Sequence, residues 1–348
     1  MVETEKFGRT REGREVTLYR LTNRVGAYVE VLDFGGRIRA LAVPDRNGDL
    51  ADVVLGYDSL AEYESDQAYH GALIGRLAGR VRESAFELNG RSFRLSPNDG
   101  PHHLHGGPAG FHNRLWTEQN SAPGALTLSL RSEDGEGGYP GGLSLRATYF
   151  FDHFNRLTLD IEARAEAETP LSLTSHPYFN LEGQKGGDIL GHWLTIPADE
   201  FLEIDRDLLP NGRRLMTKGT PLDFTAPKTI GRDIEAECPQ MKEGRGYDHF
   251  FLLPPGEGLS RAAEAWSEAS GIHLTMTTNQ PGLQFYSGNL LCGRFGKGGR
   301  PLGRHRGFCL EPQLWPGLNI PSFPAPILQP GRVFNHITCY LFSIRVHS

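Results

Sequence analysis

The segment LSLRATYFF, residues 143–151, alternates apolar and polar side chains along its length. Successive side chains of a β-strand point to opposite faces, so a period of two indicates a strand that is buried on one face. RLTLDIEAR, residues 156–164, shows the same alternation, and both segments contain the β-branched and aromatic residues that strands favour. The two segments therefore predict half-buried strands.

The alternation extends outward from this centre over much of the chain. It recurs in VTLYRLT at 16–22, AYVEVLDF at 27–34 and LTLSLRS at 126–132. FELNGRSFRL at 86–95 carries Asn-Gly at its centre, the pair that a two-residue hairpin prefers because both turn residues need positive φ. With 43 Gly and 23 Pro between such segments, the pattern predicts an all-β fold, a large antiparallel β-sandwich.

One segment leaves its secondary structure open. RAAEAWSEAS at 261–270 is rich in helix formers, although SGIHLTMTT, which overlaps its end, has the pattern of a strand. The Gly- and Pro-rich patches at 134–142 and 254–258 are too short to be interdomain linkers. We therefore expect residues 1–348 to form a single domain.

Composition limits the classes of partner. The net charge of -6 arises from interspersed acids and bases, which argues against a surface for nucleic acid or for an anionic membrane. The opening residues, MVETEKFGRTREGREV, hold no apolar core of a signal peptide, and the apolar run at 337–344 is too short to cross a bilayer. We expect a cytoplasmic monomer or weak homodimer that binds a small neutral molecule.

The four cysteines are widely spaced and include no Cys-x-x-Cys pair. This spacing suggests neither a disulfide framework nor a zinc ribbon. We interpret all four as reduced core residues because free cysteine is commonly buried. They are Cys238, Cys292, Cys309 and Cys339.

Five segments place polar side chains beside Gly, Pro or aromatic residues, as in sites built where strands end and loops begin. They are IGRLAGRV at 74–81, HHLHGG at 102–107, TSHPYFNL at 174–181, GYDHFF at 246–251 and FCLEPQLWPG at 308–317. Glu311 stands out because it follows three residues of burial-prone type. A buried carboxyl group without partners is costly or becomes protonated, and function is the commoner reason for such a placement.

Other candidates have two interpretations each. Arg80 is either a hydrogen-bond fork for a ligand hydroxyl or the partner of a surface acid. His102, His103 and His105 suggest a metal site by their spacing, but no carboxylate or cysteine stands nearby at ligand spacing. The alternative is that His105 binds a ligand directly.

The same ambiguity applies to two further residues. Taken alone, His176 is either a structural histidine with satisfied hydrogen bonds or a catalyst. Asp248 is either a turn residue that bonds its own backbone or part of a site.

As a set, the segments resemble the aldose 1-epimerases, also called galactose mutarotases. The resemblance covers nearly the whole chain, and the order and approximate spacing of the segments match the family. They are FGGRIRAL, GRLAGRV, LHGG, SHPYFNL, GYDHFF, PGLQFYSGN, LEPQLWPG and ILQPG. The resemblance implies a β-sandwich of the galactose mutarotase kind with an open sugar-binding cleft, no metal and no organic cofactor.

The resemblance also implies roles for single residues. Glu311 matches the catalytic base of the family, and His176 matches its catalytic acid. The positions that match binders of sugar hydroxyls are Arg80, His105, Asp248 and Gln284. The family often has Asn directly before the arginine, where this chain has Gly79. This departure implies that one hydrogen bond to the sugar is missing, and it leaves the sugar preference open.

The implied reaction interconverts the α and β anomers of a free aldose such as galactose or glucose. It needs one base at the C1 hydroxyl and one acid at the ring oxygen. A carboxylate suits the role of base, and an imidazole that a nearby carboxylate keeps protonated suits the role of acid. An aromatic face for the sugar is expected from Phe285, Tyr178 or Trp315. The preferred aldose stays open.

Three alternatives remain. A glycoside hydrolase would use Asp248 and Glu311 as paired carboxylates. A lectin-like protein would bind the sugar without catalysis, although it has no need of a buried base. A phosphosugar epimerase would need a cluster of Lys or Arg, which the site segments lack.

Overall fold

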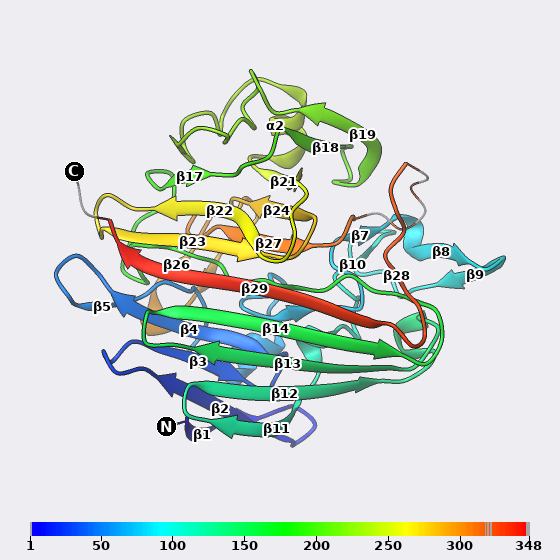
Figure 1. The fold of residues 1–348 in the computed structure, drawn as a ribbon, viewed down its shortest axis with the longest axis horizontal. Helices are drawn as coiled ribbons and strands as arrows, with labels where there is room; N and C mark the ends of the chain where they lie inside the picture. Colours follow the sequence, from blue (N-terminus) through cyan, green and yellow to red (C-terminus); the bar gives the residue numbers. More distant parts are fainter. Residues whose placement is uncertain (1, 317, 319, 321, 346–348) are drawn as a thin grey trace.

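The computed structural model describes residues 2–316, 318, 320 and 322–345. Its largest sheet is nine-stranded, and each strand pair within it is antiparallel. The strands, in order across this sheet, are β11 (Thr117–Ala122), β12 (Ala125–Ser132), β13 (Leu143–Phe151), β14 (Arg156–Ala165), β29 (Val333–Ile344), β23 (Ile272–Thr278), β22 (Ser260–Trp266), β17 (Trp193–Thr195) and β20 (Lys228–Thr229). Its long strands cross the view in Figure 1.

Two five-stranded antiparallel sheets complete the main architecture. The first holds β1 (Val2–Arg9), β2 (Glu15–Thr22), β3 (Tyr28–Leu32), β4 (Arg37–Pro44) and β5 (Leu50–Asp52). The second, in spatial order, holds β19 (Pro210–Met216), β18 (Glu200–Ile204), β21 (Asp248–Leu252), β24 (Gly282–Tyr286) and β27 (Cys309–Gln313).

Short elements fill the connections. Two-stranded pairs are β6 (Leu73–Ile74) with β16 (Thr174–Ser175), β7 (Arg80–Val81) with β10 (His103–Leu104), β8 (Ala85–Leu88) with β9 (Arg91–Arg94), β15 (Thr169–Pro170) with β28 (Ile327–Leu328), and β25 (Arg294–Phe295) with β26 (Pro301–Leu302). The helices are α1 (Leu60–Glu64), α2 (Pro239–Gly244) and the 3-10 turns η1 (Arg82–Ser84), η2 (Phe111–Asn113), η3 (Glu136–Gly138) and η4 (Lys297–Gly299). Among the described residues, no helix is long and apolar enough to cross a membrane.

The core lies between the sheets, as the alternation predicts. β13 buries every second side chain, and β12 and β14 follow the same rule. One apolar cluster joins side chains of all three large sheets, such as Val31 of β3, Leu145 of β13 and Leu283 of β24. The predicted all-β sandwich is confirmed, and so is the hairpin of β8 and β9, where Asn89 and Gly90 both have positive φ.

The segment at 261–270, whose secondary structure the sequence left undecided, contributes the strand β22 and no helix. β22 lies between β17 and β23 and pairs with both, so its backbone hydrogen bonds are made across the sheet. Its Ala263 and Ala265 are buried, because small side chains suit a position where the sheet packs against the core. Tertiary pairing outweighs the weak helix propensity of these residues.

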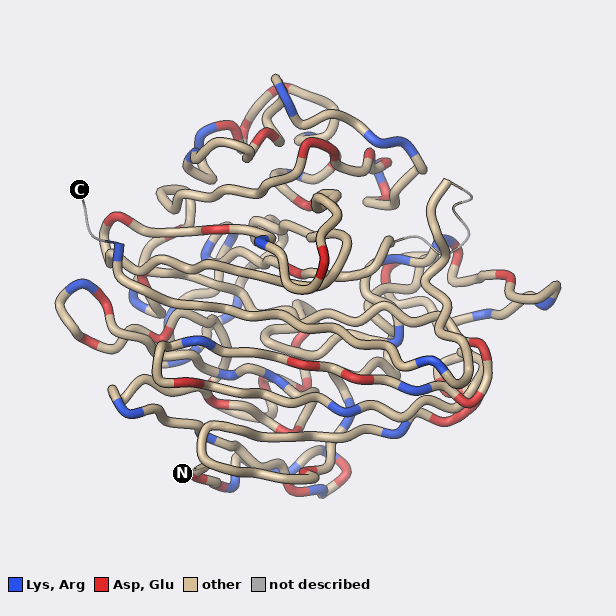
Figure 2. The backbone as a smooth tube through the Cα atoms, viewed as in Figure 1, with Lys and Arg blue, Asp and Glu red and all other residues tan. Residues whose placement is uncertain are grey.

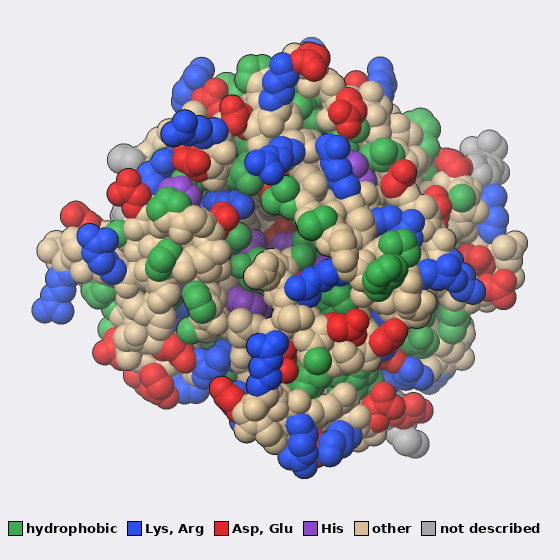
Figure 3. Space-filling model, turned by 180° about the vertical axis from the view of Figure 1, so that it is seen from behind, with side chains coloured by type: hydrophobic (Ala, Val, Ile, Leu, Met, Phe, Trp, Pro, Cys, Tyr) green, Lys and Arg blue, Asp and Glu red, His purple; other side chains and the backbone are tan. Residues whose placement is uncertain are grey.

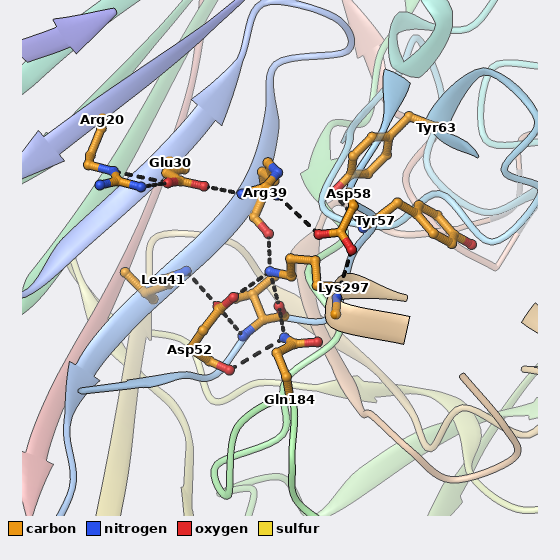
Figure 4. A network of polar contacts seen from close by, with 12 residues as sticks. Arg20, Glu30, Arg39, Leu41, Asp52, Tyr57, Asp58, Tyr63, Gln184 and Lys297 are labelled. Carbon is orange, nitrogen blue, oxygen red and sulfur yellow. Dashed lines mark hydrogen bonds and ion pairs between the residues drawn. The ribbon is translucent and has the colours of Figure 1, made fainter. Parts of the chain in front are cut away.

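A buried charged network ties η4 to the β1–β5 sheet (Figure 4). Lys297 donates hydrogen bonds from Nζ to Asp52 Oδ2 at 2.5 Å and to the carbonyl oxygen of Arg39 at 2.6 Å. Arg39 also pairs with Glu30, which in turn accepts hydrogen bonds from Arg20. These hydrogen bonds hold η4, the segment between β25 and β26, against the β1–β5 sheet.

Buried histidines make stability depend on pH. Five of them have a pKa of about 3 or 4, and burial is the largest cause of this lowering. They are His112, His176, His192, His249 and His336. Because these pKa values lie below the ordinary 6.5, the unfolded chain takes up protons first as the pH falls. Their contribution is complete above pH 6.5 and is lost toward pH 4, at about 1.4 kcal/mol per pH unit for each group.

We therefore expect the melting temperature to fall steeply between pH 6.5 and 4.5 in scanning calorimetry. Buried carboxyl groups with raised pKa, such as Asp33 at about 6, oppose this trend, but they are fewer. His249→Phe should flatten the decline, because it removes one of the five titrating rings from the core, where the ring lies edge-on to Phe201, although the backbone N–H of Asp248 then loses its acceptor, His249 Nδ1. A melting temperature that stays constant over this range would contradict the prediction.

Candidate active site

A cavity of about 350 Å³ lies against the second five-stranded sheet. The space-filling view in Figure 3 shows a hollow on the face behind that of Figure 1, with histidine side chains visible inside it. All six site residues expected from the sequence line the cavity: Arg80, His105, His176, Asp248, Gln284 and Glu311. Segments that are far apart in the sequence therefore converge on one place.

The register of two strands positions the central pair of polar side chains. β24 and β27 are antiparallel neighbours, and Gln284 lies opposite Glu311. Because alternate residues share a face, β24 also turns Tyr286 toward the cavity, and β27 adds Gln313. The intervening Phe285 points into the core, where it is fully buried.

The aromatic expectation is therefore wrong for two of its three residues. Phe285 packs against Tyr247 in the core at a ring distance of 5.2 Å. Trp315 stacks on Phe323 and lines a separate cavity of about 520 Å³. Of the three, only Tyr178 lines the candidate site.

Several lining residues escaped sequence reasoning. Tyr286 and Gln313 stand two positions after Gln284 and Glu311, so strand alternation was the signal that would have found them. Tyr69 carries no such signal, because it reaches the cavity from a loop with positive φ.

Glu311 and His176 form a buried pair. Glu311 Oε1 lies 3.5 Å from His176 Nε2, and both side chains are almost completely buried. Burial raises the pKa of Glu311 well above its ordinary value, and the negative charge of Asp248 adds to this effect. Burial also lowers the pKa of His176 to about 4, against a smaller raising effect of its own backbone.

These two shifts correct one expectation from the sequence. A carboxyl group does lie near His176, but in the protein alone the cost of burying charge outweighs the attraction between the two groups. Both shifts favour the uncharged forms of the pair, a carboxylic acid and a neutral imidazole. The imidazolium form then requires hydrogen bonds that a polar ligand brings into the cavity.

His105 is held as a hydrogen-bond donor. Its Nδ1 accepts the backbone N–H of Gly79 at 3.1 Å, so the neutral ring carries its proton on Nε2. The ring lies edge-on to Tyr69 at 4.8 Å and to His176 at 5.4 Å. Its backbone is left-handed, with φ of 54°, a conformation that is strained outside glycine and that clusters at functional sites.

Two further hydrogen-bonded pairs position polar side chains on the cavity wall. Arg80 donates from Nε to Asp99 Oδ2 at 2.7 Å, so it is the partner of an acid, and it also lines the cavity. Gln284 donates from Nε2 to Asp248 Oδ1 at 2.6 Å. Burial raises the pKa of Asp248, which begins β21 and faces the cavity.

The histidines do not make a good metal site. His102 accepts the backbone N–H of Glu83 on Nδ1, whereas both ring nitrogens of His103 are bonded, to the Ser96 carbonyl and to Tyr139. The three histidines of HHLHGG therefore have separate partners and do not converge on one point.

A second combination fits a metal no better. The ligand atoms of His105, His176 and Glu311 lie within 4.8 Å of one another. However, a metal-bound imidazole normally donates its second N–H, and the Gly79 N–H occupies that nitrogen of His105 as a donor. The set suits proton transfer and hydrogen bonding.

Comparisons with known proteins extend the picture to the whole chain. The family model for aldose 1-epimerase matches residues 17–341. The galactose mutarotase of Sus scrofa is 41% identical over 318 residues, which is 91% of each chain. The aldose 1-epimerase of Escherichia coli K12 is 35% identical over 335 residues, 95% of this chain and 96% of that one.

Solved structures agree. An aldose epimerase homologue from C. elegans superposes with a TM-score of 0.87 at 31% identity, covering 94% of this chain and 98% of that chain. The galactose 1-epimerase of Lactobacillus acidophilus NCFM gives a TM-score of 0.86 at 28% identity over 99% of both chains.

Proposed function

The chain belongs to the aldose 1-epimerase family, and from this premise we propose that it interconverts the α and β anomers of free aldoses, with Glu311 as base and His176 as acid. The observation that carries the proposal is the buried contact of 3.5 Å between Glu311 Oε1 and His176 Nε2 inside a polar cavity. An acid and a base side by side are what the opening of a hemiacetal ring requires.

The reaction proceeds by two proton transfers. Glu311 takes the proton of the C1 hydroxyl while His176 gives a proton to the ring oxygen, so the C1–O5 bond breaks and an open aldehyde forms. Rotation about C1–C2 presents the other face of the carbonyl group. His176 then recovers its proton from the hydroxyl at C5, Glu311 returns one to the oxygen on C1, and the ring closes as the other anomer.

The pair thus alternates between two protonation states. Carboxylate with imidazolium is the state that acts on the ring, and carboxylic acid with imidazole is the state that acts on the open chain. Burial favours the second state in the protein alone. Sugar hydroxyl groups in the cavity supply the hydrogen bonds that stabilise the first state.

The other polar residues hold the sugar. His105 donates from Nε2, Arg80 presents its remaining guanidinium donors, and Asp248 and Gln284 act as a linked acceptor and donor. Held in place by other protein atoms, these groups lose little entropy when they bind a ligand. Tyr178, on the wall, is the candidate aromatic face.

Polarimetry on freshly dissolved α-galactose and α-glucose tests the function. In weak buffer, the protein should accelerate the change in rotation above the spontaneous rate, and the ratio between the two sugars would begin to define specificity. Release of chromophore from aryl glycosides would instead favour the hydrolase. Sugar binding by calorimetry without any acceleration would favour a non-catalytic binder.

Gly79 offers a test of sugar binding. Its φ is +82°, and an added Cβ would meet only Pro316 Cβ, at 3.6 Å, among the described atoms around it. Asn adopts this conformation more readily than most residues, so Gly79→Asn should fold and place an amide on the cavity wall. If the amide binds a sugar hydroxyl, KM for galactose should fall by about two- to tenfold.

Gly79→Ala is the matched control, because it brings the same backbone strain without the amide. Initial rates over a range of galactose concentrations would give KM for both variants. Equal KM values for Asn and Ala would contradict the expected hydrogen bond.

We also propose the domain organisation, the class of partner, the location and the oligomeric state. Residues 1–348 act as one domain, a proposal supported by the apolar cluster that runs from Tyr19 to Phe342. Acidic and basic side chains are interspersed along the chain in Figure 2, which favours a small neutral partner over nucleic acid or membrane. Four free thiols suit a cytoplasmic location, and sedimentation would test the expected monomer or weak homodimer.

A further inference from the structure

We propose that Gln313 binds a hydroxyl group of the aldose through its side-chain oxygen, and that this contact helps to determine which aldoses the protein accepts. The inference rests on the proposed function and deepens it, because it assigns a further substrate-binding residue to the same cavity. Nothing in the sequence suggested a role for Gln313, which stands two positions after Glu311.

Strand β27 holds Gln313 beside the reacting groups. Because alternate residues of a strand share a face, Glu311 and Gln313 point to the same side of the sheet, and both line the cavity. Pro312 stands between them, and its ring fixes one backbone torsion of the segment that joins them. The two side chains therefore keep a nearly constant spacing.

The side-chain oxygen of Gln313 is buried and unpaired. Gln313 is only 2% exposed, and its Oε1 has no hydrogen-bond partner among the described residues. Of the described residues that line the cavity, Gln313 is the one with such an atom. A buried acceptor without a partner destabilises the folded protein, and native structures keep few of them. A hydrogen-bond donor that enters with a ligand relieves this cost.

The neighbouring strand supplies no side-chain donor opposite Gln313. Gly282 lies opposite it on β24 and has no side chain. The Phe250 ring fills that place, since a Cβ added to Gly282 would lie 2.0 Å from the ring. The terminal torsion of a glutamine is soft, so a small rotation turns Oε1 toward a group in the cavity.

The cavity also lacks acceptors relative to the needs of a sugar. Each hydroxyl group of an aldose has one hydrogen to donate. Arg80 and the Nε2–H of His105 act as donors. Asp248 is an acceptor, and it already binds Gln284. Gln313 adds an uncharged acceptor, and a site that is built to bind a hydroxyl group rejects the analogue that lacks it.

The competing explanation is that Gln313 is purely structural and that its amide serves only the packing of β27. That explanation predicts a lower melting temperature when the amide is replaced, and the same effect on every sugar. The proposed contact predicts otherwise, because an apolar side chain of similar shape is tolerated where a polar atom is unpaired. It also predicts an effect that depends on one hydroxyl group of the sugar.

The test removes the acceptor with two variants, Gln313→Met and Gln313→Leu. We expect KM for galactose to rise about three- to tenfold with kcat nearly unchanged, because the contact is made with the bound sugar throughout the reaction. The melting temperature without sugar should stay at or above that of the parent. Gln280→Met is the matched control: Gln280 is also buried with an unpaired Oε1, but it lines the separate cavity beside Trp315, so KM should not change.

Deoxy sugars identify the hydroxyl group by a measurement that does not depend on activity. Calorimetry gives Kd of the parent and of Gln313→Met for galactose analogues that each lack one hydroxyl group, including the one at C1. For the analogue without the contacted hydroxyl, the two proteins should bind equally well. The other analogues should keep the difference of about three- to tenfold between the proteins.

Equal Kd values of the parent and both variants for galactose would overturn the inference and leave the proposed function standing. The same difference with every analogue would overturn it too, because the effect would then be structural. A parent that binds galactose without accelerating mutarotation would contradict the proposed function, while the calorimetric comparison would still decide the contact of Gln313.

Discussion

Replacing Glu311 with Gln is expected to lower kcat for mutarotation by about 10² to 10⁴. The amide has nearly the shape of the carboxyl group, but it cannot take the proton of the C1 hydroxyl. Among the described residues, the carboxyl group that pairs with His176 belongs to Glu311, which lies opposite Gln284 on the cavity wall. Polarimetry at saturating α-galactose measures the loss.

The same variant should fold at least as well as the parent. Burial raises the pKa of Glu311, so the folded state holds its proton more tightly than the unfolded chain does. The resulting stabilisation is complete below the ordinary pKa of the carboxyl group and is lost as the pH rises through the raised value. The melting temperature of Glu311→Gln should therefore exceed that of the parent by a margin that grows with pH.

Glu3→Gln serves as the control, because Glu3 is exposed on β1, far in sequence from the cavity lining, and should leave the rate unchanged. Full activity in Glu311→Gln would remove this residue from the role of base. Asp248→Asn would then be the next variant to measure, since Asp248 is the other carboxyl group among the described residues of the wall.

Replacing His176 with Asn is expected to lower kcat by a similar factor, about 10² to 10⁴. Asn preserves a donor near the ring oxygen but has no proton that it can give up and recover near neutral pH. The loss should appear mainly in kcat, because the four binding residues keep their contacts with one another and with the wall. Stopped polarimetry with the two anomers separately would show equal losses in both directions.

The double variant Glu311→Gln/His176→Asn should be little slower than either single variant. Acid and base act in one cycle, so losing one already disables the route that needs the other. If the loss of kcat in the double variant equalled the product of the two single losses, the two groups would act independently. A His176→Asn variant within tenfold of the parent would shift the acid role to His105, which lies 5.4 Å away between ring centres.

The sequence by itself determined the all-β class and the order of the site segments. Alternation in 143–151 and 156–164 is a local property, and each strand expresses it whichever partner lies beside it. The turn at Asn89 and Gly90 is equally local, because the required positive φ is a preference of the residues themselves. The six candidate residues were identifiable because each stands in a recognisable short segment.

Only the tertiary structure decided which faces and partners those residues have. β22 became a strand because β17 and β23 lie on both sides of it, and Phe285 went into the core because the register of β24 turned Gln284 outward. The protonation of His176 depends on burial, and its contact with Glu311 depends on a strand more than a hundred residues away. Burial and long-range contact are sums over the whole fold, and no short segment contains them.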